Sequence, residues 1–281
     1  MKILLITSSA RGHAIADALS RSRHNPEIFS VCTGKNPGIR ALASEQHILD
    51  IMKFDPIVNI AKDTRPDFAF VGPDDPIGAG LADALEDAGI PTVAPKKSLA
   101  RIEASKGFTR ELLAKHGIDC SPKFSSFTRA DPELLSTFIT QDLGGEYVVK
   151  YDALKGGKGV KLSGEHLDTE EDGVAYAIEC IEECGQVVVE EKLTGIEFSL
   201  LSFVSGEQVV DMPAVQDHKR AYDGDTGPNT GGMGTYSDAD HSLPFLQNDD
   251  VERAKEINRL TAKALQDECG EGFRGILYGG F

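Results

Sequence analysis

The chain of 281 residues is 40% hydrophobic and 26% charged, a composition typical of a globular protein with two or three lobes. Its formal net charge is −16, and the acidic background has no long run of Lys and Arg. This balance argues against a nucleic-acid partner, since phosphate backbones are bound by clustered basic side chains. A pocket for an anionic substrate must therefore be locally basic.

The sequence shows no sign of export or of membrane insertion. The N-terminal MKILLIT runs straight into polar residues, and no apolar stretch approaches membrane length. The cysteines are odd in number and have no CxxC spacing, so neither a disulfide framework nor a zinc site is predicted. They are Cys32, Cys120, Cys180, Cys184 and Cys269. We expect a protein of the reducing cytoplasm, without a membrane partner.

The first third of the chain alternates strand and helix patterns. Lys2–Thr7 and 67–72 are apolar runs typical of buried parallel strands, and 91–95 predicts a brief third strand. Apolar residues at helical spacing follow the first two runs, which favours a parallel sheet with right-handed crossovers. The turns at 8–13 and 72–76 then lie at the carboxyl edge of the sheet, where such folds bind ligands.

From Ser98 the pattern changes to longer helices and paired strands. The sequence predicts helices over 98–116, 173–184 and 251–268, and strands over 147–150, 186–191, 197–204 and 273–281.

Residues 152–161 form a glycine- and lysine-rich loop between two predicted strands. The loop does not match the Walker pattern, but such a loop can close as a flap over phosphates. Lys150 ends the preceding strand, and Lys106 would add a second cation. The alternative is that both lysines are ordinary solvated side chains.

Residues 187–197 predict a strand, an irregular connection and a second strand beginning at Glu197. A hinge of this kind can offer backbone groups to an adenine, while Glu197 binds ribose hydroxyls. Acidic residues at strand ends are also common on protein surfaces.

The segment 216–236 reads QDHKRAYDGDTGPNTGGMGTY and is the most distinctive part of the sequence. Its glycines predict a flexible loop that lets another molecule approach the backbone. Lys219 and Arg220 stand before the glycines, and Arg220 can bind a carboxylate or phosphate with two parallel hydrogen bonds. A disordered surface loop is the alternative.

Together these segments resemble the ATP-grasp enzymes, and specifically the phosphoribosylamine–glycine ligase (glycinamide ribonucleotide synthetase) family. The resemblance covers nearly the whole chain in the family's order. Its carrying strings are GPDDPIGAGLADALEDAGIPTVAP (72–95), EASKGFTRELLAKHGI (103–118), VVKYDALKGGKGV (148–160), VVEEKLTGIEFSLLSFVSG (188–206), the 216–236 string and FRGILYGGF (273–281).

The resemblance implies an α/β protein: an N-terminal doubly wound parallel-sheet (Rossmann-like) domain over 1–97, then an ATP-grasp fold of two α+β subdomains over 98–188 and 189–281. It implies ATP as cofactor, with Mg²⁺ or alternatively Mn²⁺. The implied nucleotide-binding residues are Lys106, Lys150, Gly156, Gly157, Lys158, Gly159, Glu190, Glu191, Leu193 and Glu197.

The resemblance also implies the substrates glycine and 5-phosphoribosylamine, and a reaction that passes through glycyl phosphate to glycinamide ribonucleotide, ADP and phosphate in purine biosynthesis. Lys219 and Arg220 are the implied catalytic residues, as electrostatic stabilisers. The implied substrate-binding residues are Arg11, His13, Gly72, Pro73, Asp74, Asp217, His218, Asp225, Asn229, Thr230, Gly231 and Gly232.

Two departures from the family pattern stand out. The first turn reads SSARGH over 8–13, where the family has more glycines and an Arg-Glu-His run. The family also continues past the position of Phe281 into a strand that carries metal ligands, so no residue of this sequence is assigned to a metal.

These departures leave open a second hypothesis, a catalytically incomplete fragment that binds only ATP or a phosphoribosyl ligand. An ATP-grasp ligase with another acid and amine is a third. Lacking a closing strand, the sheet near 273–281 is expected to expose an edge and to favour self-association.

Overall fold

The computed structural model describes residues 1–7, 9–153 and 159–281. This part of the chain forms two compact units. One comprises Met1–Ala100 and Phe273–Gly275, and the other comprises Arg101–Gly272 and Ile276–Phe281. The three-part division suggested by the sequence, with boundaries after residues 97 and 188, stays a prediction.

The first unit is built on a five-stranded parallel sheet in the order β3-β2-β1-β4-β5. Its elements, in chain order, are β1 Lys2–Thr7, α1 Ala10–Ser20, β2 Glu27–Cys32, α2 Pro37–Leu42, β3 Glu45–Ile48, α3 Phe54–Thr64, β4 Phe68–Val71, α4 Asp74–Ala79, α5 Leu81–Asp87 and β5 Thr92–Val93.

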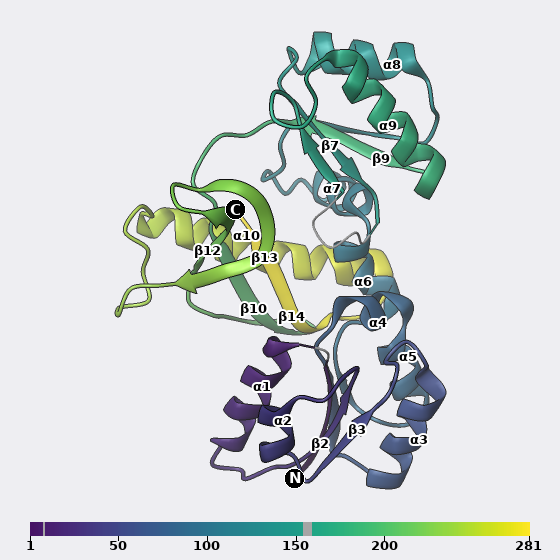
Figure 1. Ribbon diagram of the computed structural model, residues 1–281, viewed down its shortest axis with the longest axis vertical. Coiled ribbons are helices and arrows are strands. Elements are labelled where there is room, and N and C mark those ends of the chain that lie inside the picture. Colours follow the sequence, from purple (N-terminus) through teal and green to yellow (C-terminus); the bar gives the residue numbers. More distant parts are fainter. Residues whose placement is uncertain (8, 154–158) are drawn as a thin grey trace. The chain divides into compact units, whose positions relative to one another are not determined.

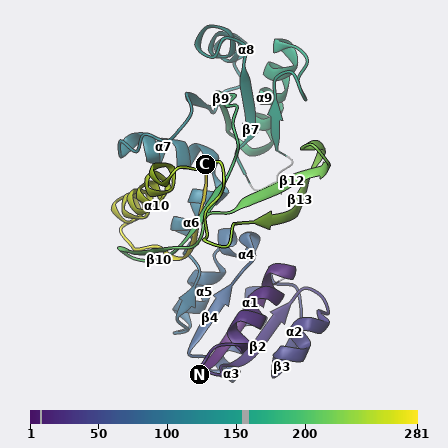
Figure 2. The ribbon, with the colours of Figure 1, turned by 90° about the vertical axis from the view of Figure 1, so that its left-hand side faces the viewer.

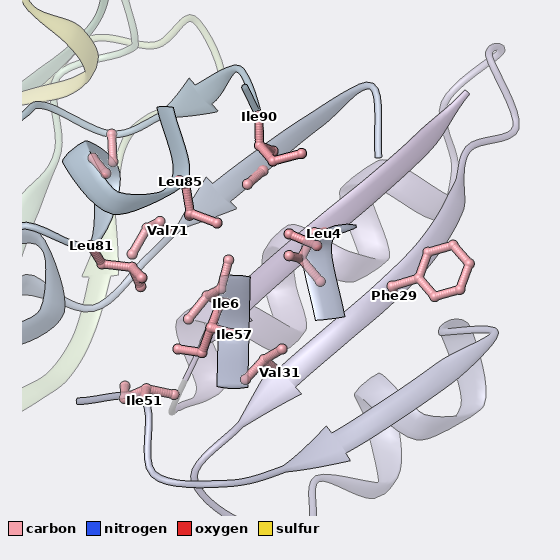
Figure 3. Packing of buried hydrophobic residues seen from close by; sticks show 14 residues of the cluster. Leu4, Ile6, Phe29, Val31, Ile51, Ile57, Val71, Leu81, Leu85 and Ile90 are labelled. Carbon is pink, nitrogen blue, oxygen red and sulfur yellow. The ribbon is translucent and has the colours of Figure 1, made fainter. Parts of the chain in front are cut away.

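Helices cover both faces of this sheet because its strands are apolar on both sides. Leu4 and Ile6 of β1 belong to one buried cluster with Ile57 of α3 and Leu85 of α5 (Figure 3). Leu5, between them, belongs to the opposite cluster with residues of α1 and α2. Alternation of side chains along each strand produces this arrangement. The doubly wound parallel sheet predicted from the sequence is confirmed.

The second unit begins with an antiparallel sheet in the order β6-β9-β7-β8. Figure 1 shows α8 and α9 beside β7 and β9. The elements up to this sheet's last strand are α6 Lys97–Ala104, which starts in the first unit, α7 Lys106–Lys115, β6 Phe124–Phe127, α8 Pro132–Thr137, the π-helical turn η1 Phe138–Asp142, β7 Tyr147–Tyr151, β8 Val160–Leu162, α9 Glu170–Cys184 and β9 Val187–Glu191.

The two faces of β7 and β9 differ in what covers them. Tyr147, Val149 and Val189 are buried in one cluster with residues of α8 and α9. Val148, Lys150 and Glu190 alternate with them and therefore lie on the other face. An ionic pair thus occupies the face away from the main core of this sheet.

The remainder of the second unit contains a three-stranded sheet in the order β11-β10-β14 and a separate two-stranded ribbon. Its elements are β10 Ser199–Ser205, β11 Gln208–Asp211, β12 Gln216–Tyr222, β13 Thr226–Tyr236, α10 Asn248–Cys269 and β14 Arg274–Gly280. Buried Asn258 of α10 donates hydrogen bonds to the Leu200 carbonyl (3.1 Å) and to Ser202 Oγ (2.9 Å), which fixes the helix against β10.

Three sequence predictions about elements need correction. The helix predicted over 98–116 is two helices, because Ser105 adopts extended backbone angles and caps α7. The strand predicted from Glu197 begins at Ser199. The loop predicted over 216–236 is mostly the antiparallel ribbon β12–β13 (Figure 2), whose irregular register accommodates its glycines. None of the described helices is long and apolar enough to cross a membrane.

Candidate functional site

Lys150 and Glu190 form an ion pair on the face of the second unit that points away from α9. In the antiparallel register Lys150 lies opposite Val188, and Glu190 lies opposite Val148. The two charged side chains are therefore diagonal neighbours on one face, within reach of each other. Lys150 Nζ contacts Glu190 Oε1. The strand pairing thus determines where the ammonium of Lys150 lies.

Glu190 is almost fully buried, with 4% of the residue exposed. Burial by itself raises the pKa of the carboxyl, but Lys150 and Arg110 outweigh that effect and hold the pKa of Glu190 below its ordinary value. The pairing therefore contributes stability above the ordinary carboxyl pKa, and this contribution is lost as pH falls through the lowered pKa. Glu190 remains ionised at neutral pH.

Lys106 opens α7 close to the end of β7. The N-cap Ser105 accepts a hydrogen bond from Phe108 N and donates one to Asp152 Oδ2 (2.9 Å). Asp152 Oδ1 accepts from Gly107 N (2.9 Å), so one carboxylate occupies the N-terminus of the helix. Lys106 Nζ donates to the Ala153 carbonyl at 3.3 Å. These bonds join the start of α7 to the residues that follow β7.

The pKa of Lys106 responds to burial and to the charges around it, that of Lys150 included. Burial lowers the pKa of Lys106 from its ordinary value; Asp152 and Glu103 oppose this shift, and the charge on Lys150 adds to it. Two ammonium groups that repel each other are placed to share an anion. The assignment of Lys106 and Lys150 to the phosphates of ATP stays a prediction.

Most of the predicted flap lies outside the described residues, namely Gly156, Gly157 and Lys158. Gly159 is described and buried, and its carbonyl accepts a hydrogen bond from Tyr151 N at 2.8 Å. The chain after the predicted flap therefore pairs directly with the end of β7.

The segment after β9 exposes apolar side chains beside fixed polar ones. Leu193 is 67% exposed and Ile196 is also exposed. Lys192 Nζ donates to the Ser163 carbonyl at 2.7 Å, and Glu191 Oε2 accepts from Lys123 N at 3.3 Å. These contacts fix the start of the connection, and the apolar side chains of Leu193 and Ile196 beyond it are exposed.

Glu197, predicted at ribose, contacts Lys219 of the ribbon through Oε1 and Nζ. Burial lowers the pKa of Lys219, but the hydrogen bond to Glu197 outweighs it, and the pKa is raised overall. A residue predicted at the nucleotide and one predicted to be catalytic thus contact each other, which the sequence alone did not show.

The guanidinium of Arg220 contacts two other groups of the second unit. Its Nη2 contacts Glu165 Oε2 at 3.0 Å, and its Nη1 donates to the Gly227 carbonyl at 2.8 Å. The guanidinium therefore already contacts a carboxylate through one nitrogen, and its predicted contact with a ligand anion through two hydrogen bonds stays a prediction. That carboxylate belongs to the protein, and Glu165 carried no sequence signal.

The other predicted residues of this segment lie on the ribbon β12–β13 or in its turn. Thr230 Oγ1 donates to the Lys219 carbonyl at 2.9 Å and accepts from Gly232 N at 3.1 Å. Asn229 lies opposite Arg220 in the register. Further along, the ring of His218 stacks on Tyr236, Asp225 and Gly232 have positive φ, Asp217 lies against Gly232, and Gly231 is exposed.

The predicted phosphoribosylamine residues lie in the first unit, at the carboxyl edge of its sheet. Arg11 Nη1 donates to the Gly72 carbonyl (3.2 Å) and lies 3.6 Å from Asp74 Oδ1. Pro73 is the N-cap residue of α4. The ring of His13 fills the space above Gly38, where a side chain would collide with it. Arg11 therefore joins the two turns that the sequence placed on one rim.

No group of three or more metal-ligating side chains comes together among the described residues. The sequence analysis did not single out Arg110 or Asp152. Arg110 contacts Glu190, the partner of Lys150, and Asp152 contacts Ser105, the residue before Lys106. The partners of these two residues are distant in sequence, so a local pattern could not reveal them.

Comparison with solved structures identifies the class of protein. The crystal structure of the Thermotoga maritima phosphoribosylamine–glycine ligase superposes with a TM-score of 0.78 and 27% identity, over 100% of this chain and 65% of that one. An Aspergillus clavatus carboxyaminoimidazole ribonucleotide synthase, solved with ATP, shares the fold with a TM-score of 0.70 and 16% identity, over 99% of this chain and 65% of that one. The architecture is a parallel-sheet domain followed by an ATP-grasp domain.

Two family models match the chain in order. The phosphoribosylglycinamide synthetase N domain covers residues 1–103, and the ATP-grasp (A) domain of the same synthetase covers 104–281. The chain belongs to the phosphoribosylglycinamide synthetase family.

Curated relatives agree with this family. The phosphoribosylamine–glycine ligases of Methanosarcina barkeri and Methanococcus vannielii are each 47% identical, over 281 and 286 residues. Each match covers 100% of this chain, and the chain spans 64% of the length of each relative.

Proposed function

We propose that this chain carries out ATP-dependent ligation of glycine to 5-phosphoribosylamine, a step of purine biosynthesis. The γ-phosphoryl group of ATP passes to a carboxylate oxygen of glycine and leaves ADP. The amine of phosphoribosylamine then attacks the carbonyl carbon of glycyl phosphate, loses a proton and expels phosphate. The product is glycinamide ribonucleotide.

The observation that carries the proposal is the pair of cations at the start of α7 and the end of β7. Hydrogen bonds from Ser105, Lys106 and Gly107 to residues 152 and 153 place the start of α7 at the end of β7. Burial and the charge on Lys150 both lower the pKa of Lys106. The flap residues Gly156–Gly159 would close over the same phosphates. The solved relative from Aspergillus clavatus, which binds ATP, has this fold.

The adenosine half of the nucleotide is proposed to lie along the connection after β9. Exposed Leu193 and the neighbouring backbone offer an apolar surface and hydrogen-bonding groups to adenine. Glu190 and Glu191 are proposed to lie at the adenine end of the nucleotide. Glu197 would bind ribose hydroxyls, and its contact with Lys219 supports a position beside the reacting groups.

Lys219 and Arg220 are proposed to stabilise the transition state. A carboxylate that attacks a phosphoryl group meets strong repulsion, which fixed cations reduce at little reorganisation cost. In the structure both side chains already contact carboxylates, Glu197 and Glu165. The incoming amine is nucleophilic once deprotonated, so no general base is assigned.

The remaining ribbon residues are proposed to bind the substrates through backbone and side-chain groups near these cations. They are Asp217, His218, Asp225, Asn229, Thr230, Gly231 and Gly232. In the first unit Arg11, His13, Gly72, Pro73 and Asp74 are proposed to bind phosphoribosylamine, because they meet at the ligand-binding edge of a parallel sheet.

Mg²⁺, or alternatively Mn²⁺, is proposed to accompany ATP, as the names of solved ATP-grasp neighbours suggest. The described residues do not supply a cluster of three metal-ligating side chains. They do not fit a protein-built metal site, so no step of the reaction is assigned to a metal ligand of this chain.

A cytoplasmic location is proposed from the five scattered cysteines, whose odd number and lack of CxxC spacing suit a reducing compartment. Self-association is proposed through β14, which lies at the edge of its sheet in the part of the chain described.

The proposed function is tested by measuring ADP release from the chain with ATP, magnesium, glycine and freshly prepared phosphoribosylamine. We expect ADP release that depends on glycine, because the γ-phosphoryl group needs the carboxylate as acceptor. Alanine in place of glycine serves as the control. Nucleotide binding without turnover would support the binding-only alternative, and ADP release indifferent to glycine would contradict both.

A further inference from the structure

Arg110 of α7 binds the carboxylate that pairs with Lys150. Its Nε donates to Glu190 Oε2 at 2.9 Å, and its Nη2 donates to Oε1 at 3.3 Å. The guanidinium therefore grips both oxygens of a buried carboxylate.

Two cationic side chains contact the single carboxylate of Glu190. Lys150 faces it from β7 and Arg110 faces it from α7. On β6 and β7 the residues opposite Glu190 in register are Phe124 and Val148, which carry no charge. One buried carboxylate thus faces two cations, although one would suffice to neutralise it.

The second cation matters when Lys150 is required elsewhere. If Lys150 turned toward a phosphate while it was the sole partner of Glu190, the carboxylate would remain buried without a counter-charge, a state that proteins tolerate poorly. A bidentate arginine removes that obstacle. Its long side chain comes from another element, so it does not depend on where Lys150 points.

We propose that Arg110 is a positioning residue of the nucleotide site, which keeps Glu190 paired so that the Lys150 ammonium is free to contact nucleotide phosphates. This inference rests on the proposed nucleotide site at Lys150. Arg110 itself touches neither substrate nor nucleotide in the proposal, and it acts through Glu190.

The test is the affinity for ADP, measured by titration calorimetry between pH 5 and pH 8. Arg110→Met is expected to weaken ADP binding about tenfold near pH 8, since Glu190 then keeps the Lys150 ammonium paired and away from the phosphates. Arg110→Lys keeps the charge and is expected to restore most of the affinity. Lys115→Met is the matched control, because Lys115 lies on the same helix and pairs with a carboxylate, Glu268, away from this site.

The pH dependence separates this role from a structural one. Without Arg110, burial raises the pKa of Glu190, so the carboxyl becomes neutral at a higher pH than in the unaltered chain. The ratio of the two ADP dissociation constants is therefore largest at pH 8 and shrinks as pH falls and Lys150 is released. Taking the ratio cancels the protonation of ADP itself.

A double-mutant cycle with Glu190→Gln completes the test. In that background Arg110→Met is expected to change ADP affinity less than twofold, because no buried charge remains to be paired. A loss that is the same in both backgrounds, a loss that does not depend on pH, or no loss at all would each overturn the proposal.

Failure of the proposed function gives a different result. If the unaltered chain bound no ADP, both the nucleotide site and the freeing of Lys150 would be contradicted. The pairing of Arg110 with Glu190 can still be tested in ligand-free protein. NMR of ¹³C-labelled glutamate measures the pKa of the Glu190 carboxyl, with its signal assigned from Glu190→Gln. Arg110→Met is expected to raise that carboxyl pKa, and Lys115→Met is not.

Discussion

Replacing Lys150 by methionine is expected to weaken ADP binding by between about 10-fold and 150-fold, because a hydrogen bond to a charged group contributes about 1.5–3 kcal/mol. The methionine side chain keeps the length of the lysine stem but provides no donor to a phosphate. Glu190 keeps Arg110 as its partner, so the fold is expected to survive. Titration calorimetry measures the affinity, and far-ultraviolet circular dichroism verifies the fold.

Lys161→Met is the matched control for this experiment. Lys161 lies on the neighbouring strand β8, and its ammonium lies over the ring of Tyr176, away from Glu190. The control is expected to bind ADP within about twofold of the unaltered chain, since Lys161 lies on the opposite face of the sheet from Lys150, over Tyr176. Equal affinities for the Lys150 and Lys161 variants would contradict a phosphate contact at Lys150.

Replacing Arg220 by methionine is expected to separate catalysis from nucleotide binding. Glycine-dependent ADP release should fall by about 10²- to 10³-fold, the usual effect of removing one group that stabilises transition-state charge. ADP affinity should stay within about twofold, because Arg220 contacts Glu165 and Gly227 and neither Lys106 nor Lys150. Steady-state kinetics and calorimetry on the same protein measure the two quantities.

Glu165→Gln controls for the contact that Arg220 makes in the structure. If that ion pair only held the ribbon in place, its loss would reduce turnover as much as the loss of Arg220. We expect turnover to be kept and the KM for glycine to be unchanged or lower, since a competing carboxylate has gone. A large loss in both variants would show that Arg220 serves the fold of the ribbon.

The sequence predicted those parts of the fold that depend on local patterns. Apolar runs such as Lys2–Thr7 mark buried parallel strands because both faces of the sheet are covered by helices. The break between α6 and α7 was missed, because Ser105 caps α7 with help from Asp152, a residue far along the chain. Such a break is decided by tertiary contacts.

The same distinction applies to the candidate site. Lys106 and Lys150 could be singled out from their loops and from the family resemblance, and hydrogen bonds in the structure join the start of α7 to the residues after the end of β7. Arg110 carries no local signal, since it lies in an ordinary amphipathic helix 80 residues before its partner Glu190. The pairs Lys219–Glu197 and Arg220–Glu165 likewise depend on how the ribbon lies against other segments of the second unit.

The central claim is that Lys106 and Lys150 hold the phosphates of one nucleotide. It is tested most directly by mass-spectrometric mapping of lysine acetylation with and without saturating ADP. Lys106 should react readily in the free protein, because its lowered pKa leaves more of the neutral amine. ADP is expected to protect Lys106 and Lys150 while exposed Lys62 and Lys263 react as before. Unchanged acetylation of both site lysines in saturating ADP would contradict the shared phosphate site.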